Sequence, residues 1–324
     1  MTLMIRVGID LGANSIRLIN ESEILFNEPC MIALDKQKHV LAIGNEALEM
    51  NKHKDDSIEI ISPITYDKIN FDALDLLLEQ ICYEFKVFKK FHKTILLLSY
   101  PTSLAESQLQ ILKQHLLNLG AYRVYFDREI WFSAIGANLN ITLPLTHCMM
   151  NIGSSNCDIA TFSNGSIQKV SEINLAGNQI MLYIMKWLKK EKNISVSLMT
   201  LENIVRKLGN VAMRSQPRTL LIRGTDLTTK EKVKLTINEN EIATVLSPFI
   251  EKWSQWILRF INNLSEDEKE DIQKSGIIAC GGTMKIHGLD RELSKRTQYL
   301  IFVTEDPLHT VARGIEILLN NMEG

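Results

Sequence analysis

Asp10-Leu11-Gly12, followed by Asn14-Ser15, has the composition of a phosphate-binding hairpin turn. Gly12 would let the backbone approach a ligand closely, and successive backbone N–H groups in such a turn can face phosphate oxygens. Asp10 could hold a hydrated metal ion. The simpler alternative is a hairpin turn without a ligand, which a short glycine pattern does not exclude.

A second glycine-containing turn is Gly281-Gly282-Thr283. It follows the apolar run from Gly276 to Ala279 and precedes a predicted helix. The two glycines could bring the backbone against an adenine ring or a phosphate. The alternative is a tight strand-to-helix turn.

Aromatic residues alternate with lysines in the segment Phe85–Lys93. If exposed, Phe85, Phe88 and Phe91 could insert into a bilayer surface while the lysines meet anionic headgroups. The alternative is an amphipathic helix end whose phenylalanines pack inward. Since no other segment is strongly basic, we expect no nucleic-acid partner.

The elements that carry these residues repeat along the chain. Apolar β-type runs at Ile5–Asp10 and His147–Asn151 each end in a small-residue turn, and each is followed by another such run, Ile16–Ile19 or Asp158–Phe162. Two similar hairpins, one opening each half of the chain, predict a duplicated α/β architecture with a cleft between the halves.

Helical periodicity is clearest in two segments. Ser103-Leu104-Ala105-Glu106 reads as a capping box for a helix that stops at Gly120, and apolar residues recur at helical spacing from Ile242 to Ile261 despite Pro248. The aromatic residues of the second helix are expected to be core packing. Strand-like Thr94–Leu98 lies before the first of these helices.

Composition limits the class of protein. The 324 residues contain 36 lysines and arginines against 38 aspartates and glutamates, so no net charge attracts nucleic acid or an anionic membrane. The five cysteines show no C-x-x-C pair, which argues against a zinc site or a disulfide framework. The N-terminal residues do not resemble a secretory signal, and no apolar run could span a bilayer, so we expect a cytoplasmic protein.

Taken in order along nearly the whole chain, the sequence resembles the MreB family, the bacterial homologues of actin. The matching segments are Ile9 to Ser15, Asn27-Glu28-Pro29, Leu41 to Ala47, Tyr100-Pro101-Thr102, Gly120 to Tyr125, Glu129 with Ala134 to Ala137, Arg223 to Thr229, Gly288-Leu289-Asp290, and Glu305 to Leu308 with Val311 to Gly314. This resemblance implies an actin-like fold of two duplicated α/β domains around a nucleotide cleft. Domain I would comprise residues 1–144 and 306–324, with a smaller subdomain near 30–63; domain II would comprise 145–305, with a smaller subdomain near 180–242.

The resemblance also implies ATP and Mg²⁺ as ligands. Glu129 matches the family's glutamate that positions the attacking water, and Asp10 would hold Mg²⁺ through water. Phe85, Phe88 and Phe91 lie where the family has its membrane-insertion loop. The implied nucleotide-binding residues are Asp10, Gly12, Ala13, Asn14, Asn151, Gly153, Ser154, Ser155, Asn156, Gly177, Glu202, Gly281, Gly282 and Thr283.

The second phosphate loop departs from the family pattern of an aspartate, a glycine triplet, two threonines and a glutamate. Here the residues from 151 to 158 read NIGSSNCD. Asn151 cannot supply the negative charge that helps hold hydrated magnesium, and we expect Ser154 and Ser155 to crowd a turn built for glycine. Val205 replaces a lysine of the adenosine pocket, and Thr283 and Ile130 replace a glycine and a proline.

The function that the resemblance implies is a cytoskeletal protein that forms a homopolymer filament on the inner face of the cell membrane and helps determine cell shape. Its partners would be further copies of itself, paralogous filament proteins, the membrane surface, and cell-wall or shape machinery. As an enzyme it would be at most a weak ATPase coupled to assembly. The alternatives are a pseudo-ATPase scaffold of the same fold, an actin-fold small-molecule kinase, and a plasmid-segregating filament.

Overall fold

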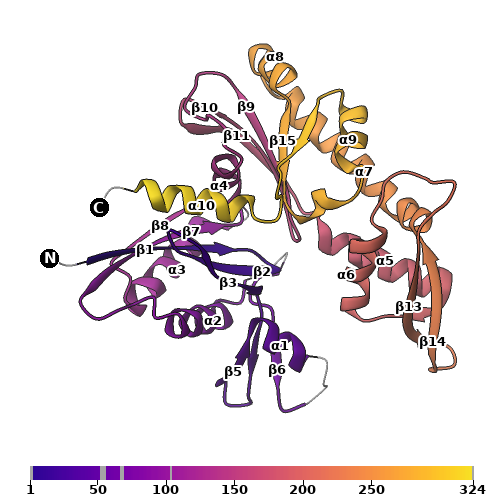
Figure 1. Ribbon diagram of the computed structural model, residues 1–324, viewed down its shortest axis with the longest axis horizontal. Helices are drawn as coiled ribbons and strands as arrows, with labels where there is room; N and C mark the ends of the chain where they lie inside the picture. Colours follow the sequence, from indigo (N-terminus) through magenta and orange to yellow (C-terminus); the bar gives the residue numbers. More distant parts are fainter. Residues whose placement is uncertain (1–2, 52–55, 66–68, 103, 323–324) are drawn as a thin grey trace. The chain divides into compact units, whose positions relative to one another are not determined.

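The computed structural model in Figure 1 describes residues 3–51, 56–65, 69–102 and 104–322. The chain divides into two compact units. Unit 1 is Met1–Asn140 together with His309–Gly324, and unit 2 is Ile141–Leu308. Unit 1 is therefore built from both ends of the chain, whereas unit 2 is one continuous segment.

Unit 1 contains a five-stranded mixed sheet with the order β3-β2-β1-β7-β8. The central strand, β1, pairs antiparallel with β2 and parallel with β7. The outer pairs are β2 with β3, antiparallel, and β7 with β8, parallel. The strands are β1 (Leu3–Leu11), β2 (Ser15–Ile19), β3 (Ile24–Pro29), β7 (His92–Tyr100) and β8 (Arg123–Arg128).

Helices cover both faces of this sheet. Val7, Ile9 and Leu11 alternate along β1 and belong to a core that also contains leucines of α2 (Phe71–Glu84) and α3 (Glu106–Leu119). The opposite face packs against α4 (Glu129–Gly136) and α10 (Thr310–Asn321), drawn in yellow in Figure 1. A Cβ added at Gly8 would lie 2.1 Å from Cγ2 of Ile315, so this glycine lets α10 approach the sheet.

Unit 2 repeats the plan of unit 1. Its five-stranded sheet has the order β11-β10-β9-β15-β16, with β9 central, antiparallel to β10 and parallel to β15. The strands are β9 (His147–Ile152), β10 (Cys157–Ser163), β11 (Ser166–Ile173), β15 (Ile277–Cys280) and β16 (Ile301–Val303). The helices are α5 (Gly177–Lys192), α6 (Leu198–Leu208), α7 (Glu239–Asn262), α8 (Glu266–Ser275), the short 3-10 helix η1 (Gly282–Lys285) and α9 (Leu289–Thr297).

Each unit also carries a small three-stranded sheet. In unit 1 its order is β5-β4-β6, and in unit 2 it is β12-β13-β14. The elements are β4 (Ile32–Leu34), β5 (Val40–Ile43), β6 (Glu59–Ile61) and α1 (Gly44–Met50) in unit 1, and β12 (Ile194–Ser195), β13 (Thr219–Asp226) and β14 (Lys232–Asn238) in unit 2. Matching large and small sheets confirm the predicted duplicated α/β architecture.

The predicted aromatic packing of α7 is confirmed. Phe249, Trp253 and Trp256 are buried in the core of unit 2, and the indole nitrogen of Trp253 donates a hydrogen bond to the Leu175 carbonyl. All five cysteines are buried, and burial raises the pKa of the Cys30 and Cys82 thiols to about 12. Among the described residues, none of the helices has the length and apolar character to cross a bilayer.

The predicted capping box of α3 is wrong in position. The helix begins at Glu106, with Ala105 as its N-cap, and the Gln108 side chain accepts a hydrogen bond from the Ala105 N–H. Glu106 is therefore the first helical residue and not the third, while Ser103 lies outside the described residues. Gly120 ends the helix as predicted, at a φ of 122° that favours glycine.

Candidate functional site

The first hairpin turn joins β1 to β2 in unit 1. The Gly12 N–H donates to the Ser15 carbonyl at 3.1 Å, and a Cβ added at Gly12 would lie 2.9 Å from that oxygen, so glycine fits the turn best. The half-buried Ala13 and the exposed Asn14 follow, and their backbone could meet a ligand. The Asn14 carbonyl accepts a hydrogen bond from the Cys30 N–H, which ties the turn to the end of β3.

Asp10 lies one residue before the end of β1 and is buried between two neighbouring strands. Arg17 of β2 and Ser99 of β7 pair with it directly. The Arg17 Nη1 contacts Oδ2 of Asp10 at 2.6 Å, and the Ser99 hydroxyl donates to Oδ1 at 2.7 Å. The Leu11 N–H donates to the same hydroxyl, which orients its proton toward Asp10. Both carboxylate oxygens are thus held by the protein.

The row of polar residues continues into β8, where Asp127 pairs with Ser99. Burial raises the pKa of Asp127 above its ordinary value, although its hydrogen bond from the Arg128 N–H and the charge of Arg128 act in the opposite direction. Glu129, the predicted catalytic residue, follows as the first residue of α4 and is largely buried. Asp10, Ser99 and Asp127 therefore form one row across β1, β7 and β8, and Glu129 follows two residues after the last of them.

The second hairpin turn, between β9 and β10 of unit 2, closes in the same way as the first. The Gly153 N–H donates to the Asn156 carbonyl at 3.1 Å. The Gly153 carbonyl accepts from the Thr283 hydroxyl at 2.8 Å and from the Gly177 N–H at 3.2 Å. These contacts bring together the predicted residues of the second loop, of the N-terminus of α5 and of η1.

Ser154 and Ser155 do not strain the backbone of this turn. Among the described residues, backbones with positive φ lie elsewhere, so Ser154 and Ser155 adopt ordinary conformations that need no glycine. The Ser154 carbonyl accepts a hydrogen bond from the Asn178 N–H at 2.7 Å, and the Ser155 hydroxyl accepts one from the Asn178 side chain at 3.3 Å. The first turn of α5 therefore supports both serines.

Asn151 occupies the place in β9 that Asp10 has in β1. It pairs with Asp158 of β10 and with Cys280 of β15. Asp158 accepts a hydrogen bond from the Asn156 side chain at 2.8 Å. A Cβ added at Gly281 would lie 2.5 Å from the Asn151 Oδ1, and Gly281 has a φ of 95°, so both space and backbone require glycine there.

The residues around Asp10 do not fit the Mg²⁺ site that the resemblance implies. Magnesium in nucleotide sites is usually held by one or two carboxylates and by water. Both oxygens of Asp10 are engaged by Arg17 and Ser99, and position 151 carries a neutral amide. Within the described residues, there is no group of three histidine, cysteine or acidic side chains that could hold a metal ion.

The residues predicted for the adenosine side lie on α6 and η1. Glu202 is exposed on α6, and Val205, which replaces the expected lysine, packs partly against the core of unit 2. Beyond α6, Asn210 is fully buried and forms an isolated bridge with His287, after η1. This bridge joins the segment after α6 to the segment that follows Gly281, Gly282 and Thr283.

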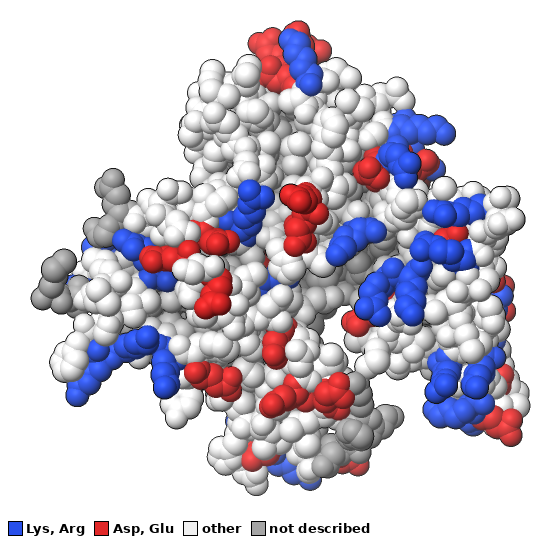
Figure 2. Space-filling model, in the orientation of Figure 1, with Lys and Arg blue, Asp and Glu red and all other residues white. Residues whose placement is uncertain are grey.

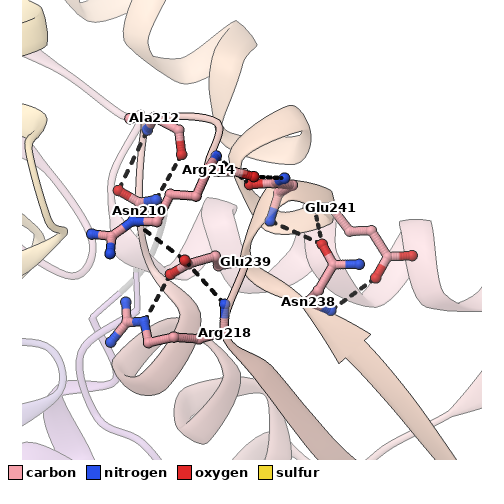
Figure 3. Close-up of polar contacts among 8 residues, drawn as sticks. Asn210, Ala212, Arg214, Arg218, Asn238, Glu239 and Glu241 are labelled. Atoms are coloured by element: carbon pink, nitrogen blue, oxygen red, sulfur yellow. Dashed lines mark hydrogen bonds and ion pairs between the residues drawn. The ribbon is translucent and has the colours of Figure 1, made fainter. Parts of the chain in front are cut away.

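Sequence reasoning missed a buried ion cluster at the start of α7, drawn in Figure 3. Glu239 is fully buried; its Oε2 contacts Nε of Arg218 at 2.8 Å and its Oε1 contacts Nε of Arg214 at 3.3 Å. Burial raises the pKa of Glu239, but hydrogen bonds from Arg218 and the charges of both arginines outweigh it, so that the pKa is lowered overall. Asn238 caps α7 in a capping box with Glu241. The pattern Asn-x-x-Glu could have revealed the cap, but not the arginines.

The predicted membrane segment does not behave as one exposed patch. Phe85 and Phe88 are partly buried against the core of unit 1, and the ring of Phe85 packs edge-on to that of Phe26 at 5.6 Å between centroids. The packing alternative therefore describes these two rings. Phe91 is 81% exposed and has a φ of 67°, which is rare for an aromatic residue. More widely, Figure 2 shows acidic and basic side chains interspersed over the face drawn.

The two repeated units, each with a central sheet, a hairpin turn beside its central strand and a small accessory sheet, define the actin-like fold. The structure of MreB5 of Spiroplasma citri bound to AMPPNP is similar, with a TM-score of 0.90 and 26% identity over 97% of this chain and 95% of that chain. The same protein bound to ADP gives a TM-score of 0.91 at 26% identity, over 98% and 97% of the two chains. The MamK double helical filament, at 13% identity and a TM-score of 0.82 over 99% of this chain and 100% of that one, shares the fold.

Sequence comparison gives the family. The profile of the MreB/Mbl protein family matches residues 4–324. The cell shape-determining protein Mbl of Bacillus subtilis (strain 168) is 29% identical over 98% of this chain and 96% of its own length, and MreB of Escherichia coli (strain K12) is 24% identical over 95% and 91%. The chain belongs to the MreB/Mbl family, which confirms the predicted resemblance.

Proposed function

We propose that this protein is an actin-like cytoskeletal protein that binds adenine nucleotide, assembles into filaments and helps determine cell shape. The observation that carries the proposal is the pair of matching hairpin turns, at Gly12–Ser15 and Gly153–Asn156, in a chain that matches the MreB/Mbl profile over nearly its full length. Relatives support it: B. subtilis Mbl is named as a cell shape-determining protein, and S. citri MreB5 was solved with AMPPNP and with ADP.

In this proposal the phosphate-facing groups are backbone N–H groups of the two turns. They are the N–H groups of Ala13 and Asn14 in unit 1 and of residues 154–156 in unit 2, because those of Gly12 and Gly153 close the turns by donating to the Ser15 and Asn156 carbonyls. Gly177, Glu202, Gly281, Gly282 and Thr283 are the proposed contacts on the adenosine side of unit 2. Glu129 is the proposed group that orients the attacking water, because phosphoryl transfer depends mainly on positioning the nucleophile and not on covalent chemistry by the protein.

A second candidate function, the pseudo-ATPase scaffold, is favoured by one observation. Asp10 is held by Arg17 and Ser99, and its counterpart in unit 2 is the neutral Asn151. Electrostatic placement of water and phosphate supplies most of phosphoryl-transfer catalysis, so these replacements weaken hydrolysis more than binding. A filament that binds nucleotide without turning it over follows from the same residues.

Localisation at the inner face of the membrane is proposed on narrower grounds. Phe91 is exposed beside Lys90, whose ammonium group lies 5.4 Å from the ring centroid. One exposed ring and neighbouring lysines bind a vesicle weakly, but the contacts of many subunits in a filament act together. Membrane binding is therefore expected to depend on assembly.

The test combines phosphate release with sedimentation. Purified protein is incubated with ATP and magnesium, with or without vesicles containing phosphatidylglycerol, next to a Glu129→Ala variant. Pelleting with nucleotide supports the filament proposal, and phosphate release above that of Glu129→Ala supports the ATPase form of it. Pelleting without release supports the scaffold, whereas failure to pellet in every condition contradicts filament formation.

A further inference from the structure

We infer that the Arg17 guanidinium is the resident counter-ion of Asp10 and takes the place of a divalent cation there, so that the protein binds adenine nucleotide without requiring magnesium. The inference rests on the proposed nucleotide binding and specifies how the first turn handles charge. It makes Arg17 a determinant of the metal requirement of this site.

The strand register fixes the contact between the two charges. Asp10 and Arg17 are directly opposite each other on antiparallel strands, in adjacent positions on one face of the sheet. Their 2.6 Å contact therefore joins two rigid strands and does not depend on the conformation of a loop. Ser99, opposite Asp10 on the other side, occupies the second carboxylate oxygen.

Burial makes the pair difficult to separate. Asp10 is 3% exposed and Arg17 is 8% exposed. An arginine side chain is not deprotonated in proteins, so a guanidinium cannot leave Asp10 as a neutral group. A cation that displaced Arg17 would leave a buried positive charge without its partner, which is strongly unfavourable.

The counterpart in unit 2 points the same way. Asn151 occupies the position equivalent to Asp10 and carries no charge for a cation to neutralise. Asp158, opposite Asn151, accepts a hydrogen bond from the Asn156 side chain. In each unit, the carboxylate beside the hairpin turn is therefore contacted by protein side chains: Asp10 by Arg17 and Ser99, and Asp158 by Asn156.

The test measures ATP binding by isothermal titration calorimetry with magnesium present and again with excess EDTA. For the wild-type protein we expect the two dissociation constants to agree within about threefold. For Arg17→Leu, which leaves Asp10 without its counter-charge, we expect binding in EDTA to be at least about tenfold weaker than with magnesium. Arg17→Lys keeps the charge and should behave like wild type.

Arg6→Leu is the matched control, because Arg6 lies on β1 and pairs with the half-exposed Glu21. It should leave the magnesium independence intact. A tenfold or greater loss of wild-type affinity in EDTA overturns the inference while leaving the proposed function standing. Absence of ATP binding in both buffers overturns the proposed function and the inference with it. If Arg17→Leu does not fold, the dissociation constants of wild type and Arg17→Lys with magnesium and with EDTA still test the inference.

Discussion

Asp10 and Asn151 occupy equivalent positions in the two five-stranded sheets, each one residue before the end of the central strand. Opposite Asp10 lies Arg17, and opposite Asn151 lies Asp158. In unit 1 the carboxylate of Asp10 therefore faces the guanidinium of Arg17, whereas in unit 2 the carboxylate of Asp158 faces the neutral amide of Asn151. A substitution that changes the charge of a residue in either pair therefore leaves a buried charge with a different neighbour.

Asn151→Asp should destabilise unit 2. The new carboxylate would lie directly opposite the fully buried Asp158, and two such groups repel when both are ionised. We expect a loss of about 2 kcal/mol in the free energy of unfolding at pH 7. Urea denaturation followed by tryptophan fluorescence measures it, because Trp187, Trp253 and Trp256 lie in unit 2.

The loss should shrink as the pH falls from 7 to 5. Repulsion raises the pKa of the added carboxyl in the folded state, so protonation at lower pH restores stability. Asn164→Asp, in the exposed turn between β10 and β11, is the control and should have almost no effect. A loss that grows at pH 5 would contradict repulsion as the cause.

Asp10 and Arg17 should be strongly coupled in a double-mutant cycle. Asp10→Asn and Arg17→Leu alone should each cost about 3–5 kcal/mol, because each leaves a buried charge without its partner. The double variant should cost clearly less than the sum. Hydrogen exchange of β1 and β2 peptides measures the effect in unit 1.

The control cycle uses Arg6 and Glu21, whose side chains are 19% and 44% exposed. Its coupling should stay below about 1 kcal/mol, since solvent screens such a pair. Additive costs for Asp10 and Arg17 would mean that the buried contact contributes nothing specific.

Glu239→Gln should remove part of the acid sensitivity of unit 2. The folded-state pKa of Glu239 is lowered, so its ionised form contributes stability above the unfolded pKa of about 4.3, and that contribution is lost as the pH falls. Wild type should therefore lose stability more steeply than Glu239→Gln between pH 5 and pH 3, by urea denaturation. At pH 7 the variant should be less stable by about 1–2 kcal/mol, because Arg214 and Arg218 are partly exposed and water can satisfy them when the carboxylate is lost.

Glu270→Gln provides the comparison for Glu239→Gln, because Glu270 and its partner Lys274 are both exposed. Its acid profile should match that of wild type. If Glu239→Gln retains the wild-type profile as well, the arginine cluster does not set the acid response.

Phe91→Asn should separate membrane binding from stability. Asparagine tolerates a positive φ better than phenylalanine does, so the variant should be as stable as wild type or more stable by about 1 kcal/mol. Loss of the exposed ring should lower co-sedimentation of filaments with phosphatidylglycerol vesicles severalfold.

The control is Ile111→Gln, at an exposed position of α3, which should leave vesicle binding unchanged. If Phe91→Asn and wild type bind vesicles equally, Phe91 does not contribute to membrane binding.

The repeated hairpins were predictable because their signal is local. Alternating apolar residues end at a glycine turn in both halves of the chain, and the two turns close with the same hydrogen bond. The aromatic face of α7 was predictable for the same reason, since helical spacing alone determines which rings are buried.

The contacts that give the site its charge balance were harder to predict. Arg17 lies seven residues after Asp10, and its role depends on a register set by the length of the turn. Ser99 comes from a strand 89 residues away. The support that Ser154 and Ser155 receive from the first turn of α5 could not be predicted either, because Asn178 lies more than 20 residues further on.

Helix α10 has a consequence for how the protein is made. It comes from residues 310–321, after the whole of unit 2, but packs against β1, and close packing with α4 depends on Gly136 and Gly314. During synthesis, all of unit 2 emerges from the ribosome before α10 does. Unit 2 can therefore fold before α10 is made, whereas one face of the unit 1 sheet is covered only by α4 until α10 emerges.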